Sequence, residues 1–362
     1  LENSRNPNFH CFISAEVRQL FFLTFPDESI FNVCKLVMGF LSASHEAPRI
    51  KASCFLKKAE YVAGETVSGY VECNVEREMK GVSNVLIMLK GEVEMLGFKT
   101  EENKSVKARE TCESVPILAN EKVLREFPNH VWDVVGRCRF NFEFTLPLGA
   151  PSSCKNEVHT KSDDLFANIV YGIHLRITMK GGKRHYPVET NGHFRIISPI
   201  PRIEEKVKEH TLPVRTFKIK NAGNIIAQIT SLSAYQADSD CELHLEMIND
   251  SSADVSGIEV SFYELIHITL RGKTKSQERC YYKNVYEGSP SGHIFGYMHQ
   301  KYRTRSLVFN TADSSPDLIV KKTLTVEHYI VVRFKLKGKS KSDPSVKIPC
   351  FIYDRRPEDD IL

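Results

Sequence analysis

The chain has 362 residues, of which 41% are hydrophobic and 26% charged, which predicts a soluble globular protein of about two domains. A net charge of +4 argues against a dedicated nucleic-acid-binding protein and allows at most local basic patches. The ten cysteines form no CxxC motif and no Cys/His cluster with zinc spacing, so we expect no metal, no cofactor, and a reduced cytoplasmic protein with core cysteines.

Residues 1–45 form an extension of unknown structure. Its apolar runs are interrupted by Pro26, Asp27 and Glu28, and each run is shorter than the ~20 residues of a membrane-spanning helix. The segment shows no basic leader followed by a cleavage site, which disfavours a signal peptide. The alternatives are an ordinary extension and a peripheral segment that contacts a membrane.

A turn and a strand follow one another in "YVAGETVSGYVE" (61–72). Gly64 is predicted to make a tight turn, and Gly69 to permit close packing or a bulge where the strand begins. Apolar residues then alternate with polar ones and place Val71, Cys73 and Val75 on one side. This period of two is typical of a strand with one buried face.

A similar unit recurs in "YQADSDCELHLE" (235–246), at an offset of 174 residues. The matching pairs are Tyr61 and Tyr235, Ala63 and Ala237, and Glu72 and Glu246. After a slip of one residue, the apolar positions from Val85 to Leu89 line up with those from Ile258 to Phe262. The repeat predicts two similar β units in one chain.

Alternation of period two continues along the chain, at 140–146, 171–179, 241–247 and 324–336. Clusters of turn-forming residues separate these segments, and no long helical pattern follows residue 49. Each segment is expected to form a strand with one wet face, as in antiparallel sheets. We therefore predict an all-β fold, made of two tandem immunoglobulin-like β-sandwich domains with a short linker.

The linker is expected in "ISPIPRIEEKVKEH" (197–210), where two prolines favour an extended chain. The predicted domains then cover residues 46–200 and 205–353, and an acidic tail covers residues 354–362.

Patterns for catalysis fail when they are tested one by one. The P-loop-like segments "RGKTK" and "GKSKS" lack the glycine five positions earlier, and the chain has no HExxH, GxSxG or GxGxxG motif. The histidines His174, His244 and His267 fall on wet strand faces, and Asp163 and Asp164 fall in a turn-like segment without an apolar wall. The sequence therefore disfavours an enzyme.

Basic side chains offer the remaining candidate sites. Lys57 and Lys58 precede the first turn, and Lys180, Lys183 and Arg184 belong to "KGGKRH", where two glycines allow a tight turn that presents cations. Such groups are usually a solvated face. The functional alternative is a site for a phosphorylated peptide or an acidic phospholipid, because Lys and Arg make charge-assisted contacts with phosphate. A nucleic acid is disfavoured, since no aromatic residues are interleaved with the cations.

An ordered set of segments resembles the arrestin fold. "YVAGETVSGYV" is similar to the opening hairpin of arrestin N-domains, "FTLPLGAPSS" to the segment before their tyrosine-containing strand, and "ISPIP" to the end of that domain. "EMINDSSADVSGIEVSFYE", "LIVKKTLTVEHYIVVRFKL" and "VKIPCFI" are similar to C-domain strands. The resemblance covers about residues 49–353 and is nearest to the arrestin domain-containing proteins, the alpha-arrestins.

The resemblance implies a non-enzymatic adaptor or scaffold in the cytoplasm, peripheral at the plasma membrane or endosomes. Its implied partners are cytoplasmic tails of membrane receptors or transporters, together with ubiquitin-ligase or coat machinery for trafficking, endocytosis or signalling. The chain contains no PP pair, and therefore no PPxY motif of the kind that WW domains read. The alternative is a retromer-like coat subunit of the same fold, stably bound to a large partner. The resemblance also implies a phosphate-sensing strand arginine, for which Arg176 is the candidate, although alternation puts Arg176 on the polar face.

Overall fold

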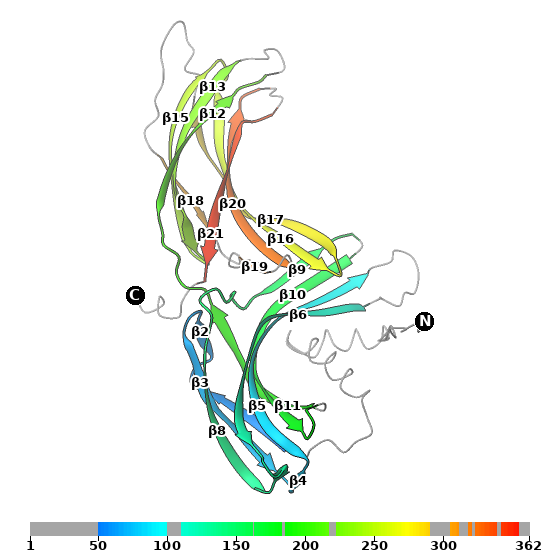
Figure 1. Cartoon of the computed structure of the whole chain (residues 1–362). Coiled ribbons are helices and arrows are strands. Elements are labelled where there is room, and N and C mark those ends of the chain that lie inside the picture. The colour runs from blue at the N-terminus through cyan, green and yellow to red at the C-terminus, as the bar shows by residue number, and fades with distance from the viewer. Residues whose placement is uncertain are drawn as a thin grey trace, which may run out of the picture.

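The computed structural model describes residues 50–99, 110–161, 163–182, 185–216, 222–289, 305–310, 318–320, 323–338 and 342–354. Two curved β-sandwiches lie end to end (Figure 1). The strands of the N-terminal sandwich are β1 (Ile50–Leu56), β2 (Glu60–Val62), β3 (Thr66–Val75), β4 (Met79–Lys80), β5 (Val82–Lys99), β6 (Glu110–Glu126), β7 (Val131–Trp132), β8 (Gly136–Thr145), β9 (Lys155–His159), β10 (Asp163–Met179) and β11 (His185–Ile197). Those of the C-terminal sandwich are β12 (Glu205–Pro213), β13 (Gly223–Leu232), β14 (Ala234–Gln236), β15 (Asp240–Ser251), β16 (Val255–Leu270), β17 (Lys273–Ser289), β18 (Arg305–Asn310), β19 (Leu318–Val320), β20 (Leu324–Leu336) and β21 (Ser345–Tyr353).

The N-terminal sandwich packs the sheet β1-β3-β8 against the sheet β2-β11-β10-β5-β6, to which β9 is added through β10. β5 and β10 pair along almost their whole length, from Val82 with Met179 to Lys99 with Asp163. The predicted alternation is confirmed in β10, where Tyr171, Ile173, Leu175 and Ile177 are all buried. On β3, Val71, Cys73 and Val75 are likewise buried.

The C-terminal sandwich repeats this plan. Its smaller sheet has the order β12-β13-β15-β18 and its larger sheet the order β14-β21-β20-β16-β17, with β19 paired to β20. Inward-facing residues of β15 and β16, such as Leu243, Val260 and Phe262, form its core. The prediction of an all-β chain with two tandem sandwiches is therefore confirmed.

The repeat seen in the sequence corresponds to equivalent hydrogen bonds in the two sandwiches. The amide of Lys58 donates to the Tyr61 hydroxyl at 3.2 Å, and the amide of Leu232, 174 residues later, donates to the Tyr235 hydroxyl at 3.0 Å. β2 pairs in parallel with β11, as β14 does with β21. The turn after each tyrosine contains a residue with positive φ, Gly64 in the first unit and Asp238 in the second. The offset of 174 residues is thus a domain repeat.

Gly69 allows β1 and β3 to approach closely. A Cβ atom at Gly69 would lie 2.1 Å from the backbone oxygen of Phe55, which no side chain tolerates. The register between β1 and β3 runs without a bulge from Ile50–Val75 to Leu56–Gly69. Of the two predicted roles, close packing is therefore the correct one.

The two sandwiches share part of one apolar core. Ile266, Ile268 and Leu270, at the end of β16, belong to the same buried cluster as the core residues of the N-terminal sandwich. A Cβ atom at Gly97 of β5 would lie 2.7 Å from Leu270 Cδ2, which shows how closely the two domains pack. The domain junction is therefore a packed interface.

Candidate functional site

The predicted cations Lys57 and Lys58 lie beside the domain junction. Both are exposed and connect β1 to β2, and Figure 1 shows β2 next to the C-terminal sandwich. The Lys58 ammonium lies 3.3 Å from Glu65 Oε1 and 5.9 Å from the centre of the Tyr61 ring.

Lys180 lies at the opposite end of the N-terminal sandwich. It follows β10, it is exposed, and its amide donates to the Gly81 carbonyl beside β4. β11 starts near this turn and ends beside β2, and its 13 residues span about 40 Å at ~3.3 Å each. Lys180 and Lys58 therefore belong to separate surfaces. Lys183 and Arg184 lie outside the described residues.

Arg176 is half-buried in β10, and its Nη2 atom lies 2.8 Å from Glu121 Oε2 on β6. The sequence could not identify this carboxylate, because β5 separates the two strands in the sheet. Arg176 and Glu121 therefore form an ion pair within one sheet. The role of Arg176 in sensing phosphate stays a prediction.

β1 is the edge strand of its sheet and, within the described residues, pairs with β3 alone. The Lys57 amide donates to the Ser68 carbonyl in register with the β1–β3 ladder. Because bonding alternates along an antiparallel pair, Ile50, Ala52, Cys54 and Leu56 direct their backbone groups away from β3. The Cys54 amide donates to Asn191 Oδ1 on β11 at 2.7 Å. Among the described strands this side of β1 is therefore an unpaired sheet edge, at which β11 supplies the side chain of Asn191.

An open hollow of about 650 Å³ adjoins the end of β1. It is lined by Lys58, Ala59, Glu60, His193, Phe194 and Arg195. Arg195 is exposed, and its Nη1 atom lies 2.7 Å from Glu60 Oε1. The lining thus carries two full cations against one carboxylate, above the buried ring of Phe194. Of these residues, the sequence predicted only Lys58. His193 and Arg195 alternate on a wet strand face, which was the available signal.

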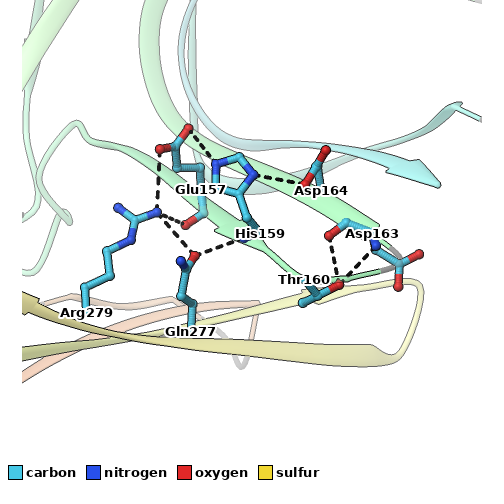
Figure 2. Close-up of polar contacts among 7 residues, drawn as sticks. All are labelled: Glu157, His159, Thr160, Asp163, Asp164, Gln277 and Arg279. Carbon is cyan, nitrogen blue, oxygen red and sulfur yellow. Dashed lines mark hydrogen bonds and ion pairs between the residues drawn. The ribbon is translucent and has the colours of Figure 1, made fainter. Parts of the chain in front are cut away.

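A polar seam joins β9 and the start of β10 to β17 of the other sandwich (Figure 2). Arg279 Nη2 donates to the Glu157 carbonyl at 2.7 Å, and the His159 amide donates to Gln277 Oε1 at 2.9 Å. Nearby, Lys275 Nζ lies 2.8 Å from Asp163 Oδ2. Asp163 and its neighbour Asp164 belong to β10 rather than to the turn-like segment that the sequence indicates, because β5 extends far enough to pair with both.

His159 bridges two carboxylates in this seam. Its Nδ1 atom lies 3.0 Å from Asp164 Oδ1, and its Nε2 atom lies 3.3 Å from Glu157 Oε2. The hydrogen bond with Asp164, more than the charge of Glu157, raises the pKa of His159 above its usual value.

Asp354 closes the junction on the other side. Its Oδ2 atom accepts hydrogen bonds from the Ser152 hydroxyl at 2.8 Å and the Ser198 amide at 3.1 Å. Burial raises the pKa of this carboxyl, and these two hydrogen bonds offset part of the effect. The sequence assigned Asp354 to the acidic tail, whereas its side chain ties the end of β21 to the N-terminal sandwich.

Glu264 and His328 form a fully buried polar pair that the sequence did not reveal. Glu264 Oε1 lies 3.4 Å from His328 Nε2, and Glu264 Oε2 accepts a hydrogen bond from the Tyr281 hydroxyl at 2.8 Å. The His328 ring stacks on Phe262, with ring centres 5.4 Å apart. The two residues face each other across β16 and β20, and such a cross-strand register cannot be read from one strand's period.

Three cations converge on one carboxylate in the first half of β16. The Glu259 side chain is 2% exposed and lies 2.9 Å from Lys335, 3.0 Å from Arg333 and 3.2 Å from Lys283. Burial opposes ionisation of Glu259, but the hydrogen bonds from Lys335 and Lys283 outweigh it, and the pKa of the carboxyl lies below its usual value. This surface therefore carries a net positive charge, with three cations around one carboxylate.

Among the described residues, no group of three or more Cys, His, Asp or Glu side chains has the arrangement of a metal site. No helix in the described part of the chain is long and apolar enough to cross a membrane.

Two family models match the chain. Residues 55–199 match "Arrestin (or S-antigen), N-terminal domain", and residues 226–357 match "Arrestin (or S-antigen), C-terminal domain". The two matches follow one another in the order of the two sandwiches and together cover more than half of the chain. A search of the curated proteins found no match.

Proposed function

The chain belongs to the arrestin family, and from that premise we propose that it is an adaptor that binds an extended, anionic cytoplasmic segment of a membrane receptor or transporter. Arrestin-family proteins are in general non-enzymatic adaptors of trafficking and signalling. In this proposal the bound segment lies along the outer side of β1 and places an acidic or phosphorylated group in the hollow beside Lys58. Cytoplasmic action, at the plasma membrane or endosomes, is part of the same proposal.

One observation carries the proposal, namely that an edge strand and a cationic hollow adjoin each other. Ala52 and Leu56 direct backbone groups outward from β1, where they can pair with an added strand. Lys58 and Arg195 lie where such a strand would continue, and both can make charge-assisted hydrogen bonds with phosphate.

The Glu60 and Glu65 carboxylates already hold these cations, so an incoming group must compete with them. A phosphate, with its charge of about −2, competes better than a carboxylate. We therefore expect phosphorylated segments to bind more tightly than unphosphorylated ones.

Fluorescence anisotropy of labelled tail peptides with the full chain tests this function. Lys58→Glu together with Arg195→Glu is expected to weaken binding of the phosphorylated peptide by about a hundredfold or more, since two cation–phosphate contacts are worth roughly 1.5–3 kcal/mol each. Lys206→Glu, on exposed β12 of the other sandwich, is the matched control and is expected to leave binding unchanged.

The variant Asn191→Ala is expected to change the binding affinity in the opposite direction. It removes the side chain that occupies the Cys54 amide, and we expect it to tighten binding by up to about tenfold, the worth of one hydrogen bond. Equal binding by all these variants contradicts the proposed site. Loss of binding only in Lys180→Ala moves the site to the far turn, and binding to acidic vesicles without peptide indicates a lipid partner.

A further inference from the structure

Two cysteines face each other directly across neighbouring strands of the N-terminal sandwich. Cys73 of β3 is opposite Cys138 of β8 in a register that runs unbroken from Thr66–Thr145 to Val75–Gly136. Directly opposed residues point to the same face of a sheet, here the face turned to the core. Other cysteines in the described registers face a different residue type: Cys54 faces Val71, Cys112 faces Leu96, Cys280 faces Tyr263, and Cys350 faces His328.

The ladder positions show that the two α-carbons are at bridging distance. The Leu146 amide donates to the Glu65 carbonyl in the β3–β8 register, and alternation from there makes Cys73 and Cys138 a hydrogen-bonded pair. The α-carbons of such a pair are about 5.5 Å apart, inside the range of about 4.4–6.8 Å that disulfides span. Their β-carbons, at about 4.5–5.5 Å, must draw together to reach the usual ~3.8 Å.

The pair lies where the sheet can make that adjustment. Only Asn74–Arg137 and Val75–Gly136 follow it before the described ladder ends, and Gly136 has a φ of 105° that begins β8. The remaining strain is expected to keep the bond reducible, because strained disulfides have more oxidising potentials than relaxed structural ones.

From this geometry we propose that Cys73 and Cys138 are a reversible disulfide site, oxidised by low-molecular-weight disulfides such as glutathione disulfide. The structure contains both residues as free thiols. The reaction ties β8 to β3, which is the strand that also carries β1.

The two thiols have distinct parts in the reaction. Cys73 is fully buried, and burial, followed by the nearby Cys138 and Glu72, raises the pKa of its thiol to about 12. Cys138 is only half-buried, so its thiolate is the one that can reach glutathione disulfide. Cys138 sulfur attacks one glutathione sulfur, forms a mixed disulfide and releases one glutathione thiolate.

The second step completes the exchange inside the sheet. Cys73 sulfur attacks the Cys138 sulfur of the mixed disulfide, its proton passes to the departing glutathione sulfur, and the second glutathione leaves as a thiol. The protein loses two protons and two electrons, and one glutathione disulfide becomes two glutathione molecules.

The test is equilibration of the full folded chain in glutathione buffers of increasing oxidised fraction, followed by alkylation and peptide mass spectrometry. We expect a Cys73–Cys138 linked peptide that accumulates as the buffer is oxidised and disappears when the buffer is reduced again. Cys138→Ser removes the linkage, and the exposed control Cys112→Ser retains it. Cys73→Ser leaves Cys138 glutathionylated, which distinguishes the first step, attack by Cys138, from the second step, attack by Cys73.

Hydrogen exchange of backbone amides distinguishes the disulfide from modification of an accessible thiol alone. We expect the β8 amides near Cys138 to exchange several-fold more slowly after oxidation of the wild-type chain. The proposal is overturned if the folded chain forms only Cys138–glutathione adducts, if Cys73 stays alkylatable on unfolding at all buffer ratios, or if Cys138 pairs with another cysteine.

Discussion

The paired side chains of Glu264 and His328 set a strong constraint at the scale of single residues. Both are fully buried, and the carboxylate accepts a hydrogen bond from the Tyr281 hydroxyl. Removing one member of a buried pair leaves the other without its partner in a low dielectric, which costs more than the intact pair contributes.

We expect Glu264→Leu and His328→Leu each to lower the free energy of unfolding by about 3 kcal/mol. The double variant is expected to cost clearly less than the two together, because neither polar group is then stranded. Urea denaturation of the four proteins measures this coupling, with Glu242→Leu on exposed β15 as a control within about 0.5 kcal/mol of wild type. Additive costs contradict a coupled pair.

His159 makes a pH-dependent contribution. Because the pKa of His159 is raised in the folded protein, folding favours its protonated form. The stabilisation is complete below the unfolded value of about 6.5 and is lost as the pH rises through the folded value. The side chain is 45% exposed, so solvent screening limits the contribution to about 0.5 kcal/mol.

His159→Gln therefore destabilises the chain at about pH 5.5 and has no effect at about pH 8.5, on either side of the titration. Unfolding curves at the two pH values measure the difference, and His244→Gln, exposed on β15, is the matched control. An equal loss of unfolding free energy at both pH values contradicts this account and indicates that His159 stabilises the fold by packing alone.

The approach of β1 to β3 depends on one glycine at the scale of elements. Gly69→Ala places a methyl group against the Phe55 backbone oxygen, where relief requires the strands to separate. We expect a loss of about 2 kcal/mol or more and faster amide exchange in β1. Gly149→Ala, which meets nothing within 4 Å, is the control and is expected to stay within about 0.5 kcal/mol. Equal stabilities of the two variants would falsify the close-packing role.

The sequence predicts strands and buried faces well because each depends on a local period. The alternation at 171–179 and 241–247 gave the buried side chains of β10 and β15 correctly. The partners of charged groups were not predictable, because Arg176 and Glu121, or Glu264 and His328, meet across strands distant in sequence. Register between strands, rather than period along one strand, decides these contacts.

The domain junction was the least predictable feature at the scale of the whole molecule. The sequence indicated two sandwiches and a linker, whereas the structure adds a shared apolar cluster and the polar contacts of Asp354 and Arg279. These residues come from segments up to two hundred residues apart, since Ser152 and Asp354 are 202 residues apart. No local pattern distinguishes them from an ordinary strand end.

Leu270 is expected to couple the two sandwiches during unfolding. Leu270→Ala removes buried side-chain volume from the junction, so we expect a loss of about 2–3 kcal/mol and a broader, less cooperative calorimetric transition. Leu148→Ala, whose leucine is 78% exposed, is the control. A wild-type-like transition width in Leu270→Ala contradicts coupling through this contact.

The binding site proposed on β1 is tested most directly by amide exchange on the full chain with and without a phosphorylated tail peptide. The account predicts slower exchange at Ala52 and Leu56, whose amides face outward, and no change at Ser53 and Phe55, whose amides bond to β3. Protection confined to other surfaces, such as the turn at Lys180, with Ala52 and Leu56 unchanged, contradicts it.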